Sequence, residues 1–221
     1  MKLFLSALTK YLLGFVLVGA MLFLSAWTLD YPGAWLFLGL LFVPMLLMGA
    51  VMLLKAPTLL RERLDGKEKE KAQKGVVALA GLMFPIGFVL SAFDFRYGWS
   101  RVPLWLVIAA SAFFLVGYAA YAEVMRENTY LSRTVKVQEG QKVISTGLYG
   151  VVRHPMYLAT LLMFLPMPLI LGSLLSFAVF LLYPFLIAKR ILGEEELLKQ
   201  ELAGYADYCQ TVRWRLVPYI W

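Results

Sequence analysis

The sequence contains one cysteine, one histidine and few charged residues. Only 16% of its 221 residues are charged, whereas an average soluble domain has about 25%. The single cysteine, Cys209, excludes an intramolecular disulfide. The single histidine, His154, has no cysteine and no cluster of carboxylates beside it in the sequence. We therefore expect no metal site.

Hydrophobic residues make up 61% of the chain and are concentrated in six apolar blocks, a pattern typical of membrane helices. We predict an all-α protein, a polytopic transmembrane bundle of about six helices. Pro166, Pro168 and Gly172 interrupt the last two blocks, which should form a C-terminal helical hairpin. Whether this hairpin crosses the bilayer completely is left open. The six blocks are Tyr11–Leu29, Ala34–Leu54, Val76–Phe93, Val102–Tyr121, Met156–Leu171 and Ser173–Ile187.

The basic residues are distributed unevenly between the two sides of this bundle. With six spans, 19 of the 21 lysines and arginines lie in the N-terminus, in Lys55–Lys74, in Ala122–His154 and in the tail from Lys189 onward. The positive-inside rule places these segments, both termini included, in the cytosol. The basic run after the second block is explained by topology and by contact with anionic lipid heads. We expect no nucleic-acid partner, because no binding motif accompanies the charges. We divide the chain into an N-terminal four-helix region, residues 1–121, and a catalytic region, residues 122–221.

The polar stretch that ends at Tyr157 is the first candidate for a functional site. Pro155 suits the first position of a helix, which would put His154 at the N-cap, next to unpaired backbone N–H groups that attract anions. Arg153 adds a fixed positive charge, while Tyr149 and Tyr157 add aromatic faces and hydroxyls. A small molecule with a carboxylate, a ribose and a planar base would find partners here. The alternative is a basic and aromatic anchor at the membrane interface, which composition alone favours.

The charged tail supplies carboxylates that could complete such a site. The run Glu194-Glu195-Glu196 opens an amphipathic stretch, although acidic residues at a helix start also suit a plain surface helix. Near a cytosolic cleft, these carboxylates could accept hydrogen bonds from ribose hydroxyls or compensate the positive charge of a sulfonium. Farther along, aromatic residues alternate with arginines and could fold back along the membrane as a lid. These residues are Tyr205, Tyr208, Arg213, Trp214 and Arg215.

Together these motifs resemble the isoprenylcysteine carboxyl methyltransferase family and, more loosely, the bacterial phospholipid and thiol methyltransferases of the membrane. The resemblance rests on Gly147-Leu-Tyr149, on Arg153-His154-Pro155-Met-Tyr157, on Glu194-Glu195 and on Tyr205-x-x-Tyr208. It covers approximately Glu127 to Pro218 and implies S-adenosyl-L-methionine as cofactor, held on the cytosolic side. The cofactor-binding residues that it implies are Gln141, Lys142, Val143, Ile144, Gly147, Tyr149, Arg153, His154, Pro155, Met156, Tyr157, Glu194 and Glu195.

The resemblance also directs attention to catalytic residues. If the acceptor is an amine or a thiol, a general base is useful, and Glu194, Glu195 or His154 is the candidate. A carboxylate acceptor needs no base. Eukaryotic members of the family have a substrate-contacting arginine where this chain has Ile191, and the neighbouring Arg190 is our candidate for that role.

The sequence therefore predicts an integral membrane enzyme, a methyltransferase that uses S-adenosylmethionine. Its acceptor would be a lipidic or small hydrophobic molecule with a carboxylate, an amine or a thiol. Membrane lipids are the other expected partners, and the resemblance implies a bacterial inner membrane. Two alternatives stay open: a membrane reductase of lipidic or sterol-type substrates that uses NADPH, and a non-enzymatic transporter or assembly protein. The apolar blocks contain almost none of the ionisable residues that mark transport paths, which speaks against a transporter.

Overall fold

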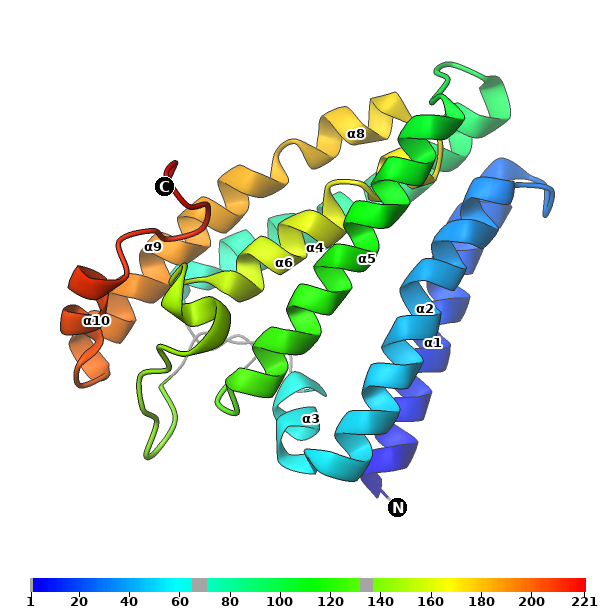
Figure 1. Ribbon diagram of the computed structural model, residues 1–221. Helices are drawn as coiled ribbons and strands as arrows, with labels where there is room; N and C mark the ends of the chain where they lie inside the picture. The colour runs from blue at the N-terminus through cyan, green and yellow to red at the C-terminus, as the bar shows by residue number, and fades with distance from the viewer. Residues whose placement is uncertain (1, 65–70, 132–136) are drawn as a thin grey trace.

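The computed structural model describes residues 2–64, 71–131 and 137–221, and for residues 71–73 only the backbone. Within these ranges the chain is built of helices joined by turns and short loops (Figure 1). The elements are α1 (Lys2–Ala26), α2 (Pro32–Lys55), α3 (Pro57–Leu64), α4 (Lys71–Tyr97), α5 (Leu104–Glu127), the 3-10 turn η1 (Gly147–Gly150), α6 (Pro155–Phe164), α7 (Met167–Ile170), α8 (Leu174–Phe180), α9 (Tyr183–Glu201) and α10 (Tyr205–Thr211).

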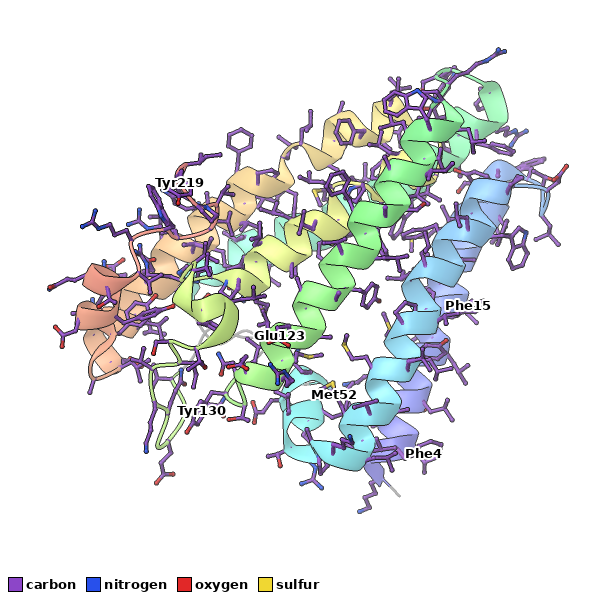
Figure 2. All side chains as sticks on the ribbon, in the orientation of Figure 1. Phe4, Phe15, Met52, Glu123, Tyr130 and Tyr219 are labelled. Carbon is purple, nitrogen blue, oxygen red and sulfur yellow. The ribbon has the colours of Figure 1, made fainter. Side chains whose placement is uncertain are left out.

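In the described part of the chain, five helical segments are long and apolar enough to cross a membrane, and a shorter apolar one accompanies them. The outer side of α1 exposes apolar side chains such as Phe4 and Phe15, as lipid contact requires (Figure 2). The prediction of an all-α membrane bundle is thus confirmed. The five segments are Lys2–Ala26, Pro32–Lys55, Lys74–Tyr97, Leu104–Glu127 and Leu174–Glu201, and the shorter one is Pro155–Ile170.

The ends of two helices differ from the prediction. Helix α1 begins at Lys2 rather than Tyr11 and ends before Trp27, whose φ of 59° leaves the helical region. Helix α5 continues past Tyr121 to Glu127, so the first part of the predicted polar segment is helical. Hydropathy locates the apolar middle of a span, but it does not report the polar turns that extend the same helix into water.

The polar parts of the chain gather at one end of the bundle. The start of α1, α3, the end of α5 and α10 all lie there (Figure 1). This grouping agrees with the uneven distribution of charge along the sequence, and the side of the membrane that this end faces stays a prediction. Four of the basic residues counted above, Lys67, Lys69, Arg133 and Lys136, lie outside the described residues.

Helix α6 packs closely along α5 because Gly117 of α5 has no side chain. A Cβ atom at Gly117 would lie 2.7 Å from Cγ of Met163 and 3.0 Å from the carbonyl oxygen of Ala159. Distances this short would force the two helices apart. The glycine therefore fixes the position of α6, and with it the position of the polar residues at the start of α6.

The predicted C-terminal hairpin turns at Gly172, whose φ is 84°. A fully buried carboxylate, that of Asp94 at the end of α4, holds the bend in place. It accepts hydrogen bonds from the backbone N–H of Ser100, at 2.7 Å, and from the hydroxyls of Ser100 and Ser173. Ser173 is in turn the N-cap of α8. Asp94 thus ties the loop between α4 and α5 to the start of α8.

Replacing Asp94 with alanine should destabilise the protein by about 2–3 kcal/mol, because the three donors that it satisfies lose their acceptor together. Thermal unfolding in detergent measures the effect, and the control is Asp30→Ala, which removes an exposed carboxylate in the turn before α2. Equal unfolding midpoints for the two variants would show that other contacts hold the bend.

Candidate functional site

The turn before α6 is tied to the end of α5. Gly147 has a φ of 56°, and a Cβ atom there would lie 3.0 Å from Cγ of Glu127. The hydroxyl of Thr146 donates a hydrogen bond of 2.6 Å to the Glu127 carboxylate. A side chain at position 147 would be strained and would crowd Glu127, so the glycine allows this close approach. The 3-10 turn that follows places Tyr149 in the interior.

His154 occupies the N-cap position of α6, and Pro155 is its first residue, as predicted. The imidazole does not cap the helix. Its Nε2 atom lies 3.1 Å from Oε1 of Glu195 on α9. The backbone N–H of His154 donates to the carbonyl oxygen of Arg215 at 2.8 Å. The C-terminal tail therefore folds back onto the start of α6.

Glu195 lies at the centre of a buried ion cluster, with 3% of its side chain exposed. Its Oε1 atom accepts from Nε of Arg153 at 2.7 Å, and its Oε2 atom accepts from Nε of Arg215 at 3.0 Å. Arg153 also donates to the carbonyl oxygens of Val212 and Arg213. Burial opposes the charge of Arg153, but the hydrogen bond and the charge of Glu195 outweigh burial and raise the pKa of Arg153. This cluster joins α6, α9 and the tail.

Glu194, the neighbour of Glu195, takes part in a different set of contacts. Its carboxylate accepts a short hydrogen bond from the hydroxyl of Tyr157 on α6. The same hydroxyl accepts a hydrogen bond of 2.9 Å from Nε of Arg190, one helical turn earlier on α9. Adjacent residues on a helix point in directions about 100° apart, so the two carboxylates bind different groups.

A polar pocket of about 100 Å³ lies between the loop after α5, the start of α6, α9 and α10. Tyr149 lies in its wall, where its hydroxyl accepts from the Asn128 amide at 2.9 Å. Burial raises the pKa of the Tyr149 phenol to about 12, and the hydrogen bond from Asn128 lowers it in part. The phenol is therefore neutral at physiological pH. The lining residues are Asn128, Tyr130, Leu131, Gln141, Lys142, Val143, Ile144, Tyr149, Arg153, His154, Met156, Tyr157, Arg190, Glu194, Leu198, Leu202, Tyr205 and Tyr208.

Two tyrosines of α10 close the pocket. The hydroxyl of Tyr208 donates to the carbonyl oxygen of Tyr149 at 2.7 Å. The hydroxyl of Tyr205 is buried and has no hydrogen-bond partner within the described part of the chain. Burial raises the pKa of both phenols. A buried hydroxyl without a partner is costly, so the Tyr205 hydroxyl is open to a group that enters the pocket.

A second, larger cavity of about 630 Å³ lies among the membrane helices. Its walls come from α2, α3, α4, α5, α6 and α9 and are mainly apolar. Met52, near the junction of α2 and α3, is one of the lining residues (Figure 2). Three residues line both this apolar cavity and the polar pocket, namely Met156, Tyr157 and Arg190. The two spaces therefore adjoin at these three side chains.

Most of the site residues predicted from the sequence lie around the polar pocket. Three of them do not line it. Gly147 lies in the turn before α6, Pro155 is the first residue of α6, and Glu195 lies in the ion cluster. Their predicted roles, like those of the lining residues, stay predictions. The predicted residues that line the pocket are Gln141, Lys142, Val143, Ile144, Tyr149, Arg153, His154, Met156, Tyr157, Arg190 and Glu194.

Several lining residues were not among those predicted. Tyr205 and Tyr208 belong to the quoted motif, but the only role predicted for them was a lid, inferred from the alternation of aromatic residues and arginines in the tail. Asn128 and Tyr130 lie just after α5 and line the pocket. Leu198 and Leu202 follow Glu194 at helical spacing and could have been found from that periodicity. In the described ranges, no group of three or more histidine, cysteine or acidic side chains is placed to hold a metal ion.

The fold and the site define a class, a polytopic helical membrane protein in which a polar pocket adjoins an apolar cavity. Residues 105–203, from α5 to just after α9, match the phospholipid methyltransferase family. A stretch of 91 residues is 31% identical to the mouse (Mus musculus) Delta(14)-sterol reductase TM7SF2, covering 40% of this chain and 22% of that protein. The chain thus aligns with less than a quarter of that relative. The family match supports a membrane methyltransferase, whereas the narrower isoprenylcysteine carboxyl methyltransferase identity stays a prediction.

Proposed function

We propose that this protein is an integral membrane methyltransferase that uses S-adenosyl-L-methionine to methylate a lipidic or hydrophobic acceptor. The observation that carries the proposal is the meeting of the polar pocket and the apolar cavity at Met156, Tyr157 and Arg190. A water-soluble donor and an apolar acceptor need different surroundings, one polar and one apolar. The two spaces must also adjoin, because methyl transfer requires the reacting atoms to be near contact distance. The match of residues 105–203 to a methyltransferase family supports the same conclusion.

The side chains of the polar pocket fit such a cofactor. The unpartnered hydroxyl of Tyr205 offers a hydrogen bond, and the phenol rings of Tyr149 and Tyr208 offer apolar faces for a planar base. The carboxylate of Glu194 lies on the pocket wall and would favour a positive charge or ribose hydroxyls. When bound, S-adenosylmethionine supplies a methyl group activated by a positively charged sulfur.

The chain's own residues would position the reactants and exclude water. Glu194, Tyr157 and Arg190 form a connected row at the shared wall, so a proton released by an amine or thiol acceptor would find Glu194 as its base. Glu195 and His154 bind each other and, through Arg153, hold the start of α6 against the tail. Under this proposal Glu195 acts by positioning its neighbours.

The proposal includes an orientation. The basic end of the bundle would face the cytosol, because 19 of the 21 lysines and arginines belong to segments that the sequence places on that side. Both termini and the polar pocket would then be cytosolic, in a bacterial inner membrane. The division of the chain into residues 1–121 and 122–221 also remains a proposal.

A ligand screen by thermal shift on detergent-purified protein tests the proposed function. We expect S-adenosylhomocysteine and S-adenosylmethionine to raise the unfolding midpoint in a saturable manner, because ligands that bind the folded state stabilise it. NADPH is the comparison ligand, since the 31% identity over 91 residues is to a sterol reductase. Stabilisation by NADPH alone would favour a reductase, and stabilisation by none of the three would contradict both enzymes.

A further inference from the structure

The tail forms a compact loop at residues 216–221, which we call the tail loop, after it has passed the ion cluster of Glu195. Leu216 is buried in the apolar core of the membrane helices, and Val217 and Trp221 pack against the same core. The chain leaves α10 and runs back along α9 toward the start of that helix (Figure 1). The tail loop therefore lies against the apolar bundle and not among the polar segments.

Most of the backbone of the tail loop is hydrogen-bonded within the loop. Leu216 and Val217 both donate to the carbonyl oxygen of Trp221, at 2.9 Å and 3.2 Å. Ile220 and Trp221 both donate to the carbonyl oxygen of Val217, at 3.2 Å and 3.1 Å. Pro218 has no N–H to satisfy. A segment whose backbone is satisfied in this way can enter a lipid environment, where unsatisfied polar groups are costly.

The tip of the tail loop presents two large side chains to its surroundings. Tyr219 is 87% exposed and Ile220 is 78% exposed. Tyr219 lies on the outer side of the tail, away from α5 and α6 (Figure 2). Its φ of 66° is uncommon for a residue with a bulky side chain. The turn thus holds an aromatic side chain outward at a position where glycine would be the easier residue.

The chemistry of the tip matches the head-group region of a lipid bilayer. The tail loop carries no charged side chain, and the ring centroids of Trp214 and Tyr219 lie 5.5 Å apart. Tyrosine and tryptophan are enriched at the boundary between lipid and water, where the ring is buried and the polar group is hydrated. Phe185 of the adjoining helix α9 is 72% exposed, as lipid contact requires. These features favour a bilayer over a soluble protein as the partner of the tip.

The segment just before the tail loop connects it to the candidate site. The carbonyl oxygen of Trp214 accepts from the backbone N–H of Arg153 at 2.9 Å. The carbonyl oxygen of Arg215 accepts in the same way from His154. The guanidinium of Arg215 also lies over the ring of Trp221, with Cζ 5.3 Å from the ring centroid. A contact that fixes the tail loop therefore also restrains the segment that binds the start of α6.

We propose that the tail loop inserts Tyr219 and Ile220 into the head-group region of the lipid bilayer, and that this contact holds the tail against the start of α6. The partner is the bilayer in which the protein resides. The start of α6, which forms part of the pocket wall, is then held most firmly when a bilayer surrounds the protein. The proposal is independent of the reaction that the site performs.

Spin labelling in a phosphatidylcholine nanodisc tests the insertion. Cys209 is the only cysteine of the sequence, so Cys209→Ala provides a background in which Ile220→Cys takes a single label. We expect molecular oxygen, which concentrates in the bilayer, to relax this label more strongly than a water-soluble nickel complex does. The control is Asp207→Cys in the same background, an exposed position on α10 at the polar end, where we expect the opposite order.

Two results of this experiment would overturn the proposal. Stronger relaxation of the Ile220→Cys label by nickel, as in the control, would place the tip in water. Dipolar broadening between two labels would show that a second copy of the chain, and not lipid, covers the tip.

The hold on the tail is tested with the double variant Tyr219→Ser, Ile220→Ser. In the nanodisc, trypsin cleavage after Arg213 and Arg215 should become about tenfold faster or more, because losing the lipid contact of a large apolar side chain shifts the opening of the tail by that factor. Mass spectrometry of the released peptides measures the rate. The control is Leu29→Ser, which removes an exposed apolar side chain from the turn before α2 and should be cleaved like wild type. Equal rates for the double variant and the control would overturn the link between the tip and the tail.

Discussion

Replacing Glu195 with glutamine should destabilise the protein by about 3–5 kcal/mol, because removing one partner of a buried ion cluster leaves the other charges uncompensated. Arg153, with 6% of its side chain exposed, would lose its carboxylate partner, and Arg215 would lose the contact that ties the tail to α9. The tail should then be held less firmly at the start of α6, where the hydrogen bond from the His154 backbone N–H to the Arg215 carbonyl oxygen remains. Thermal unfolding and limited proteolysis of the C-terminal segment measure these two effects.

The control for this variant is Glu196→Gln, the next residue on α9, whose side chain is exposed. It removes the same charge from the same helix and should unfold within experimental error of wild type. If Glu195→Gln were as stable as Glu196→Gln, the ion cluster would not be what holds the tail. A stable Glu195→Gln protein that had lost only methyl transfer would indicate a direct catalytic role for Glu195.

Replacing Glu194 with glutamine should have the opposite outcome, a folded protein with little activity. Its carboxylate accepts from the Tyr157 hydroxyl at the wall shared by the two spaces, and it lies outside the ion cluster of Glu195. For an amine or thiol acceptor, which needs a base, we expect the rate of methyl transfer to fall about hundredfold or more, the usual effect of losing a positioned acid–base group. The rate is measured with methyl-labelled S-adenosylmethionine and a lipid extract, followed by analysis of the methylated species.

Affinity for S-adenosylhomocysteine in the same variant separates two roles. Weaker binding together with slow transfer assigns Glu194 to the cofactor, and normal binding with slow transfer assigns it to the reaction. Glu196→Gln is again the matched control and should transfer methyl groups at the wild-type rate. Wild-type transfer in Glu194→Gln would remove Glu194 from the site.

Local sequence signals were enough to predict the start of α6. Pro155 has no N–H to lose at the first position of a helix, and the helix indeed begins there, with His154 at the N-cap. The contact that the imidazole makes could not be predicted from local signals. It reaches Glu195, 41 residues later in the chain, and no local pattern reports a partner at that separation. The burial of these residues also speaks against the alternative of a membrane-interface anchor. An anchor needs side chains exposed to the lipid head groups, whereas Arg153, His154 and Tyr157 are buried.

The two acidic neighbours illustrate the limit of motif reasoning. The sequence presents Glu194 and Glu195 as one motif, and the resemblance assigned both to the cofactor. On a helix they point in directions about 100° apart. The position of α9 against α6 and the tail then places Glu194 on the pocket wall and Glu195 in the ion cluster.

Hydropathy and charge sufficed to predict an all-α membrane bundle with its polar segments at one end, because a lipid environment demands long apolar helices whatever their neighbours are. The cavities needed the packed structure. The methionines of the apolar cavity come from α2, α5 and α6, and its two arginines come from α3 and α9. Residues so distant in the chain meet only after the helices pack, and the meeting of the two spaces at Tyr157 is a consequence of that packing.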